Sequence, residues 1–233
     1  IYCGVGVDLR QNYITKEQPN TIFDLSKRVL PFHNEKNNEI LVTIGNTFTQ
    51  NDFDYIQQLS EILKDSGEPG GAGFIGSNLV DELVTKDIQV SVIDDFSTGK
   101  IENTNKLVHY WKQDLGKVDI KELTQFMKGV DVVFHTAAKA RVQPSIDDPL
   151  SFNKSNVDGT LNILWAAHKA GVKRVIYSAS SSAYGNATKF PTPEDHSTNP
   201  LSPYGLQKYI GEQYCKMFSE VYGLDTVCLR YFN

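Results

Sequence analysis

The sequence predicts an α/β fold, in which helices cover both faces of a doubly wound parallel β-sheet. Two observations support this prediction. In the second part of the chain, short apolar runs typical of buried strands alternate with longer stretches whose apolar residues recur at helical spacing. That part also begins with a glycine-rich segment, Gly70 to Ser77, of the kind that leads into the first helix of such folds.

The composition indicates a globular chain of one or two domains. Of 233 residues, 40% are hydrophobic and 22% charged, which excludes wholesale disorder. The net charge of -5 lacks the basic surplus of nucleic-acid-binding proteins. No apolar run reaches the roughly 18 to 20 residues that cross a bilayer, and we see no signal peptide, so we expect no membrane partner. The 3 cysteines show no Cys-x-x-Cys spacing, so we expect neither disulfides nor a metal site, and a cytoplasmic location.

Residues 1–66 carry few structural signals and are left unassigned. The apolar, β-branched run 40–44 predicts a strand, and the helical spacing of apolar residues over 52–64 predicts a helix. One strand–helix unit does not identify a domain, and this segment could be foreign to the rest of the chain.

Residues 67–233 contain the alternating pattern and form the predicted main domain. Its expected strands are 90–93, 108–111, 130–135, 172–178 and 226–229, and its expected helices are 76–86, 119–128, 150–170 and 203–222. In the last helix, five apolar residues share a face: Leu206, Ile210, Met217, Phe218 and Val221.

The glycine loop is the first candidate site. Gly70, Gly73 and Gly76 recur every three residues, and backbone amides at a helix N-terminus can cradle a pyrophosphate only where no Cβ blocks the approach. A glycine-rich turn without a ligand is the alternative interpretation. Asp94 ends the following strand, where a carboxylate would accept hydrogen bonds from the adenosine ribose and repel a 2′-phosphate, which favours NAD over NADP. The alternative for Asp94 and Asp95 is an ordinary turn.

A second candidate is the pair Tyr204 and Lys208. Spaced four residues apart, the two side chains share a helix face, and an ammonium stabilises a neighbouring phenolate, so the tyrosine can act as a base. About one such spacing is expected by chance in a chain of this composition. This match, however, follows the glycine loop in the order and at the distance that a dehydrogenase fold needs.

A third candidate is the serine-rich loop from Ser178 to Gly185, at the end of an expected strand. Ligands of open α/β sheets lie outside the carboxyl ends of strands, and small hydroxyls there can bond a substrate oxygen. The alternative is a polar loop without function.

Residues 70–233 resemble the NAD-dependent epimerase/dehydratase family, the extended short-chain dehydrogenases that act on nucleotide sugars. Eight segments carry the resemblance, in order: Gly70–Ser77, Val92–Gly99, Gln113–Leu115, Val133–Ala138, Asn156–Thr160, Tyr177–Gly185, Ser202–Lys208 and Leu229–Asn233. The resemblance implies a Rossmann-like fold, NAD as cofactor, and a homodimer paired through helices 150–170 and 203–222.

The resemblance also implies roles for individual residues. Tyr204, Lys208 and Ser180 match the catalytic positions, and Ser182, Arg141 and Asn233 match positions near the sugar nucleotide. The implied cofactor-binding residues, besides Tyr204 and Lys208, are Gly70, Gly73, Phe74, Ile75, Gly76, Asp94, Asp95, Ser97, Thr98, Gly99, Asp114, Leu115, Ala137, Ala138, Lys139 and Asn156.

Within the family, the serine-rich loop separates the reactions. Dehydratases carry an Asp-Glu pair just before the second tyrosine of this motif and decarboxylases a Glu, whereas this chain has Ser182 and Ala183. Because water elimination then lacks its acid and base, the loop is most similar to that of a 4-epimerase of UDP-hexoses or UDP-N-acetylhexosamines. A dehydratase, a decarboxylase, and a non-catalytic NAD-binding fragment or decayed copy remain the alternatives.

Two departures from the family pattern affect the expected fold. The six residues before the glycine loop, 64–69, are polar and end in a proline, so they cannot form the usual buried first strand. We therefore expect that strand to be lacking and a join near 64–70; alternatively, Ile40–Thr43 fills the slot and 44–69 are an insertion. The chain also stops at Asn233, where the family's substrate domain begins, so we expect that domain to be lacking.

Overall fold

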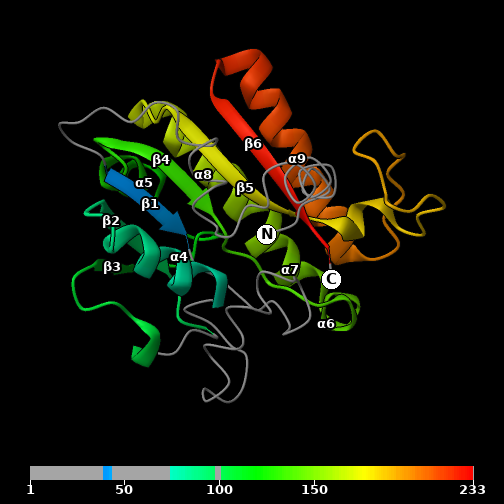
Figure 1. Ribbon diagram of the computed structural model, residues 1–233, viewed down its shortest axis with the longest axis horizontal. Coiled ribbons are helices and arrows are strands. Elements are labelled where there is room, and N and C mark those ends of the chain that lie inside the picture. The colour runs from blue at the N-terminus through cyan, green and yellow to red at the C-terminus, as the bar shows by residue number, and fades with distance from the viewer. Residues whose placement is uncertain (1–38, 44–73, 98–100, 233) are drawn as a thin grey trace.

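The computed structural model describes residues 39–43, 74–97 and 101–232. Its centre is a parallel six-stranded sheet with the strand order β3-β2-β1-β4-β5-β6 (Figure 1). The strands are β1 (Glu39–Thr43), β2 (Gln89–Asp94), β3 (His109–Lys112), β4 (Val130–His135), β5 (Arg174–Ser180) and β6 (Asp225–Tyr231). This order is that of a doubly wound Rossmann-like sheet and confirms the predicted fold class.

The central strand of the sheet is β1, so the expectation that this strand is lacking was wrong, and the alternative that Ile40–Thr43 fills the slot is confirmed. Ile40 pairs with Val90 of β2 on one side and with Val132 of β4 on the other. The sheet takes its central strand from much further upstream than the residues directly before the glycine loop, and the polar stretch 64–69 lies outside the described residues. A slot in a sheet is filled by any segment that can form the backbone ladder, so sequence adjacency to the loop is not required. Residues 44–73, including the expected helix 52–64, lie outside the described residues.

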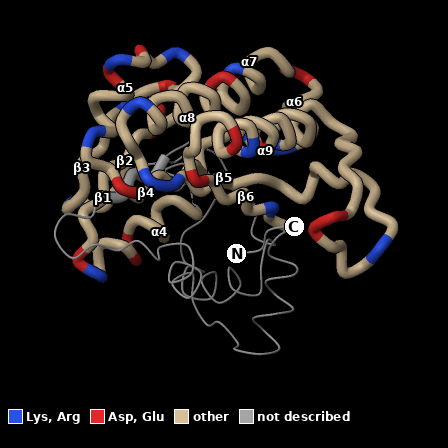
Figure 2. Tube along the Cα trace, turned by 90° about the horizontal axis from the view of Figure 1, so that it is seen from above, with Lys and Arg blue, Asp and Glu red and all other residues tan. Residues whose placement is uncertain are grey.

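Helices cover the sheet on both faces. Figure 2 shows α4 on one side of the strands and α5, α8 and α9 on the other. The helices are α4 (Phe74–Val84), α5 (Ile120–Phe126), α6 (Val142–Asp147), α7 (Pro149–Asn153), α8 (Gly159–Ala170) and α9 (Pro203–Tyr222), with 3₁₀ turns η1 (Ile101–Asn103) and η3 (Ser181–Tyr184) and a π-helical turn η2 (Lys154–Asp158). The four expected helices of this domain are present, although 150–170 is interrupted by the π turn. Among the described segments, none of the helices has the length and apolarity to cross a membrane.

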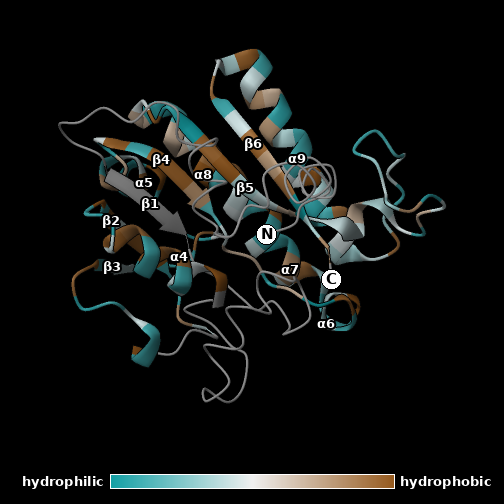
Figure 3. Cartoon of the chain, viewed as in Figure 1, coloured by the Kyte–Doolittle hydropathy of each residue, from teal (hydrophilic) through white to brown (hydrophobic). Residues whose placement is uncertain are grey.

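The main core lies between the sheet and the layer of α5, α8 and α9. Val133 and Val175 from the strands and Ile163, Leu164 and Phe218 from the helices are fully or almost fully buried there. Figure 3 shows the hydrophobic colour along β4 and β5, the strands beneath this layer. Burial on this scale, of order 2 kcal/mol for each large apolar side chain, fixes the register of the strands that carry the candidate site.

The buried face of α9 is not the apolar face that the sequence suggested. Of the five apolar residues, Phe218 is buried, whereas Leu206 is 47% and Val221 64% exposed. The buried face instead carries Tyr204, Lys208 and other polar side chains. Helical periodicity finds the two faces of a helix but does not reveal that a site, rather than solvent, faces the polar one.

The carboxyl ends of β1, β2 and β4 meet where the strand order changes direction. The chain winds outward from β1 to β3 and then crosses back to β4 on the other side of β1. Connections on either side of this point leave in opposite directions, which opens the crevice where doubly wound sheets bind ligands.

Candidate functional site

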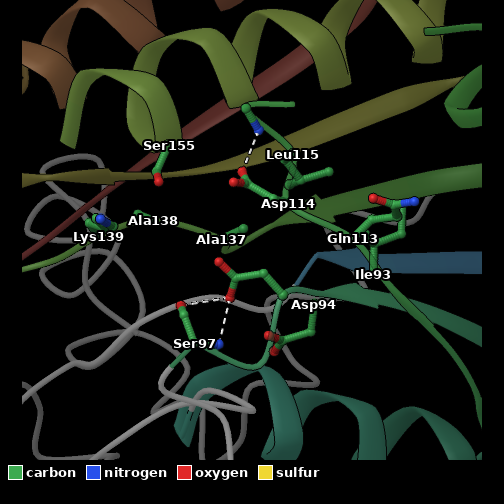
Figure 4. A pocket seen from close by; sticks show the side chains of 12 residues that line it. Ile93, Asp94, Ser97, Gln113, Asp114, Leu115, Ala137, Ala138, Lys139 and Ser155 are labelled. Atoms are coloured by element: carbon green, nitrogen blue, oxygen red, sulfur yellow. Dashed lines mark hydrogen bonds between the residues drawn. The ribbon is translucent and has the colours of Figure 1, made fainter. Parts of the chain in front are cut away.

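A pocket occupies this crevice. It encloses about 400 Å³ including solvent at its mouth, and its residues come from the ends of β2, β3 and β4 and from the π turn. Figure 4 shows Asp94 and Ser97 on one side and Asp114, Leu115 and Ser155 on the other. The lining residues are Ile93, Asp94, Asp95, Ser97, Gln113, Asp114, Leu115, Gly116, Ala137, Ala138, Lys139 and Ser155. Eight of the predicted cofactor-binding residues are therefore brought together in one place.

Asp94 is the most unusual side chain of this pocket. It is only 2% exposed, and its Oδ1 accepts a hydrogen bond of 2.6 Å from the N–H of Phe96. Its Oδ2 is buried and has no hydrogen-bond partner in the described part of the chain. Burial raises the pKa of Asp94 to about 7, against the opposing effect of the Phe96 N–H. A buried carboxylate oxygen without a donor is costly, which indicates that a ligand supplies the donor.

The other acidic residues of the pocket are already paired. Asp95 accepts hydrogen bonds from the N–H and the hydroxyl of Ser97, at 2.8 and 2.7 Å. Asp114 accepts from the N–H of Gly116 at 2.9 Å and forms an ion pair with Lys117 at 2.8 Å. These contacts hold the two loops that flank Asp94, so the loops face each other across the pocket.

Asn156 connects the pocket to α9. Its side-chain oxygen accepts from the N–H of Lys139 at 2.7 Å, and its amide donates to the carbonyl of Lys139 at 2.9 Å and to Oε1 of Gln207 at 3.1 Å. Asn156 lies in the π turn η2, whose wider winding interrupts an otherwise continuous helix, and such turns are frequent at functional sites. Asn156 therefore contacts Lys139, a residue that lines the pocket, and its predicted role in binding the cofactor remains a prediction.

Tyr204 and Lys208 lie one turn apart on the buried face of α9. Lys208 is 2% exposed, and its ammonium lies 4.6 Å from the centroid of the Tyr177 ring. Burial lowers the pKa of Lys208 to about 8, against the opposing effect of the Glu212 carboxylate. Tyr204 is buried as well, and its N–H donates to Oγ of Ser145 at 3.1 Å. The predicted Tyr–Lys pair is thus held on a fixed helix face with its cation partly desolvated.

The serine-rich loop packs against the same helix. Ser180 is the last residue of β5, and its Oγ accepts from the N–H of Ser182 at 3.1 Å, which caps the turn η3. The carbonyl of Ser182 lies so close to Gly205 that a Cβ there would approach it within 2.8 Å. Glycine at 205 therefore allows η3 to approach the first turn of α9, where Tyr204 lies.

Several predicted site residues are not part of these groups. Gly70, Gly73, Thr98, Gly99 and Asn233 lie outside the described residues. Phe74, Ile75 and Gly76 form the first turn of α4, as expected for the helix that follows a glycine loop. Arg141 is exposed, precedes α6 with φ at 88°, and does not line the pocket. Its predicted role in binding the sugar nucleotide remains a prediction.

Sequence reasoning missed several residues that the structure adds. Ile93, Gln113, Gly116 and Ser155 line the pocket. Gly116 is required by the fold, since a Cβ there would lie 2.5 Å from the carbonyl of Lys154, but the sequence does not show that these two residues meet. Ser155 had no signal, because the π turn shifts residues off the helical spacing that was assumed.

The residues of the pocket fit NAD. The two hydroxyls of an adenosine ribose are donors of the kind that the unpartnered Oδ2 of Asp94 needs, and the same carboxylate would repel a 2′-phosphate. Among the described residues, no cluster of three or more His, Cys, Asp or Glu is placed to hold a metal ion.

Comparison with known proteins agrees with this fit. The model of the NAD dependent epimerase/dehydratase family matches residues 69–233. The UDP-glucose 4-epimerase of Mycolicibacterium smegmatis is 40% identical over 163 residues, which are 67% of this chain and 51% of that protein. The chain spans about half the length of the curated relatives that it matches.

Solved structures give the same result. The UDP-N-acetylglucosamine 4-epimerase of Methanobrevibacter ruminantium, solved with UDP-N-acetylmuramic acid, is 37% identical with a TM-score of 0.68, over 85% of this chain and 56% of that one. The UDP-glucose 4-epimerase of Brucella ovis, solved with NAD, is 31% identical with a TM-score of 0.69, over 84% of this chain and 52% of that one. The fold, the pocket and the extent of the family match together show that this chain belongs to the NAD dependent epimerase/dehydratase family.

Proposed function

We propose that this chain carries the cofactor-binding and catalytic part of an NAD-dependent 4-epimerase of UDP-linked hexoses or N-acetylhexosamines. The observation that carries the proposal is the pair of Tyr204 and Lys208 on the buried face of α9, with Ser180 on the adjoining loop. The relatives named above are epimerases of UDP-sugars, which supports the substrate class.

The cofactor would lie in the pocket at the ends of β2, β3 and β4. Asp94 would accept hydrogen bonds from its ribose, Asp114 and Leu115 would contact its adenine, and Ala137, Ala138 and Lys139 would line its path toward α9. When bound, NAD supplies a nicotinamide that accepts a hydride from C4 of the sugar and returns it.

Tyr204 is the proposed base. Its phenolate removes the proton from the 4-hydroxyl as the C4–H bond breaks, giving a 4-keto sugar, and the phenol returns the proton when the sugar is reduced on its other face. Lys208 favours the phenolate by its positive charge and would hold the ribose hydroxyls. Ser180 would bond the 4-oxygen, and Ser182 would contact the sugar.

The serine-rich loop favours epimerisation over the alternatives. No residue from Ser178 to Gly185 is a carboxylate, so a dehydratase would have no acid and base there to remove water. The loop holds hydroxyls, which suffice for a reaction that only moves a proton and a hydride.

We also propose a homodimer through α8 and α9. The exposed apolar stripe of α9, which includes Leu206 and Val221, is the face that such pairing would cover. Sedimentation analysis tests this. The wild-type chain should sediment as a dimer and Val221→Glu as a monomer. A wild-type chain that sediments as a monomer would contradict the pairing.

The proposed function is tested in two steps with the purified chain. Isothermal calorimetry should show micromolar NAD binding, and NMR of UDP-glucose and UDP-N-acetylglucosamine with the chain and NAD should show formation of the C4 epimer. Tyr204→Phe should reduce turnover by about 10²-fold to 10⁴-fold while NAD still binds. NAD binding without any turnover of either sugar would instead favour the non-catalytic alternative.

A further inference from the structure

A buried ion pair begins one helical turn after Lys208 on α9 and has no part in the mechanism above. The guanidinium of Arg230 on β6 donates to both carboxylate oxygens of Glu212 on α9, from Nε at 2.9 Å and from Nη2 at 2.6 Å. The two side chains are 14% and 7% exposed. Two-point pairing of this kind fixes the direction of the carboxylate as well as its distance.

Glu212 follows Lys208 by one helical turn on the same buried face of α9. At that spacing the two side chains are neighbours, and a carboxylate beside an ammonium favours its charged form. Burial lowers the pKa of Lys208, and the Glu212 carboxylate is the largest of the influences that raise it. The titratable groups that act on or lie around Lys208 are Tyr204, Glu212 and Cys215 on α9, Tyr177 on β5, Cys228 on β6 and His135 on β4.

Arg230 also contacts the serine-rich loop. Its guanidinium lies 4.4 Å from the centroid of the ring of Tyr184, the last residue of η3. One guanidinium therefore contacts both α9, which carries Tyr204 and Lys208, and the loop that begins at Ser180. A second contact also fixes β6 against α9: the Thr226 hydroxyl donates a hydrogen bond of 3.1 Å to the carbonyl of Cys215.

We propose that Glu212 and Arg230 are positioning residues of the epimerase site: Glu212 keeps Lys208 in its ammonium form, and Arg230 fixes that carboxylate while holding the Tyr184 end of the serine-rich loop. This inference rests on the function proposed above. Because Lys208 must carry its charge to favour the phenolate of Tyr204, the pair acts on the chemistry without touching the substrate.

The test is the titration of Lys208 itself. In the chain labelled with ¹³C at lysine Cε, the Lys208 signal is assigned by its disappearance in Lys208→Arg and followed by NMR from pH 6 to pH 11. In Glu212→Gln, the midpoint should fall by about one pH unit or more, because the carboxylate is gone while the amide oxygen still accepts from Arg230.

Two further variants separate the charge from the packing. Glu212→Gln/Arg230→Gln keeps hydrogen-bonding groups of similar size with no charge, and its midpoint should lie between those of the wild type and Glu212→Gln. The matched control is Glu220→Gln, which removes a carboxylate from an exposed i, i+4 pair with Lys216 on the same helix and should leave the midpoint unchanged.

Two results would overturn the inference: an unchanged Lys208 midpoint in Glu212→Gln, or a midpoint fully restored to the wild-type value in the double variant. The first would give the pair a purely structural role, and the second would attribute the shift to an unpaired Arg230. The titration needs neither cofactor nor turnover, so it decides this point even if the chain fails to epimerise UDP-sugars.

Discussion

Two side-chain carboxylates, those of Glu212 and Asp94, are buried among the described residues, and their surroundings differ. Glu212 accepts three hydrogen bonds from Arg230, within the ion pair that links α9 to β6. Asp94, at the end of β2, accepts one hydrogen bond from a backbone N–H, and its second oxygen has no partner in the described part of the chain. Among the described residues, the Glu212 carboxylate has donors for both oxygens, whereas the Asp94 carboxylate has a donor for one oxygen only.

The difference separates a positioning role from a binding role. Removing a charge from water costs several kcal/mol unless partners replace the water, so a fold keeps an unsatisfied carboxylate only where function requires it. The contrast predicts opposite effects on stability. Removing the partner of Glu212 should destabilise the fold, and removing the charge of Asp94 should stabilise it.

The largest effect is expected for Arg230→Met. This variant leaves Glu212 buried without its partner, which should lower the free energy of unfolding at pH 7 by about 3 to 5 kcal/mol. Urea denaturation followed by circular dichroism measures it.

The control for this prediction is Glu212→Met/Arg230→Met, which removes both charges and should recover most of the stability. A loss below about 1 kcal/mol in the single variant would mean that the pair behaves like an exposed salt bridge, and the contrast with Asp94 would then fail.

The opposite sign is expected for Asp94→Asn. The pKa of Asp94 is about 7 in the fold and 3.8 otherwise, so the folded chain binds the extra proton, and stability falls as the pH rises from about 4 through 7. At pH 8 without NAD, the free energy of unfolding of the variant should therefore be about 2 to 4 kcal/mol higher than that of the wild type. At pH 4 the two should be equal.

The same variant should lose affinity for NAD in calorimetry, since the ribose hydroxyls lose their charged acceptor. The pairing of greater stability with weaker binding is the signature of a binding role. If Asp94→Asn is less stable than the wild type at pH 8, the carboxylate has a partner in the fold and the interpretation of this residue is wrong.

The fold of 74–232 could be predicted from the sequence because its strands and helices each carry a local pattern. Apolar runs such as Val130–His135 are too short and too continuous for helices, and the strand–helix alternation then leaves few topologies. The place of the central strand β1 was predicted only as the alternative. The run 40–44 was recognised as a strand, but its partners in β2 and β4 are far away in sequence, and no local pattern decides between this strand and a missing one.

The candidate site divides in the same way. Asp94, Tyr204 and Lys208 lie within motifs of fixed spacing, so the sequence predicted them. Glu212 and Arg230 are far apart in sequence and become partners only when β6 packs on α9, so nothing in either segment indicates the pair. Asn156 was predicted by resemblance, but its contact with Lys139 depends on a π turn that helical periodicity does not anticipate.

Asn156→Leu tests whether a buried, hydrogen-bonded but uncharged side chain stabilises the fold as the paired carboxylate of Glu212 does. The substitution removes the partners of the Lys139 backbone and of Gln207, and should lower the free energy of unfolding by about 2 kcal/mol. Affinity for NAD should fall with it, because Lys139 lines the pocket. Unfolding and calorimetry measure the two effects, and a stability loss without any loss of affinity would make Asn156 purely structural.

The smallest effect is expected for Ser145→Ala. The Ser145 hydroxyl donates to the carbonyl of Val142 at 2.6 Å and accepts from the N–H of Tyr204, so it holds the first turn of α9 against α6. A buried hydrogen bond of this kind contributes about 1 kcal/mol to stability. Because this contact fixes the backbone of Tyr204, the variant should lose more turnover in the UDP-sugar assay than affinity for NAD, which depends mainly on the pocket at the ends of β2, β3 and β4. Loss of NAD affinity without loss of turnover would reverse the assignment, and would place the contact between α6 and α9 in the cofactor site instead of beside the catalytic tyrosine.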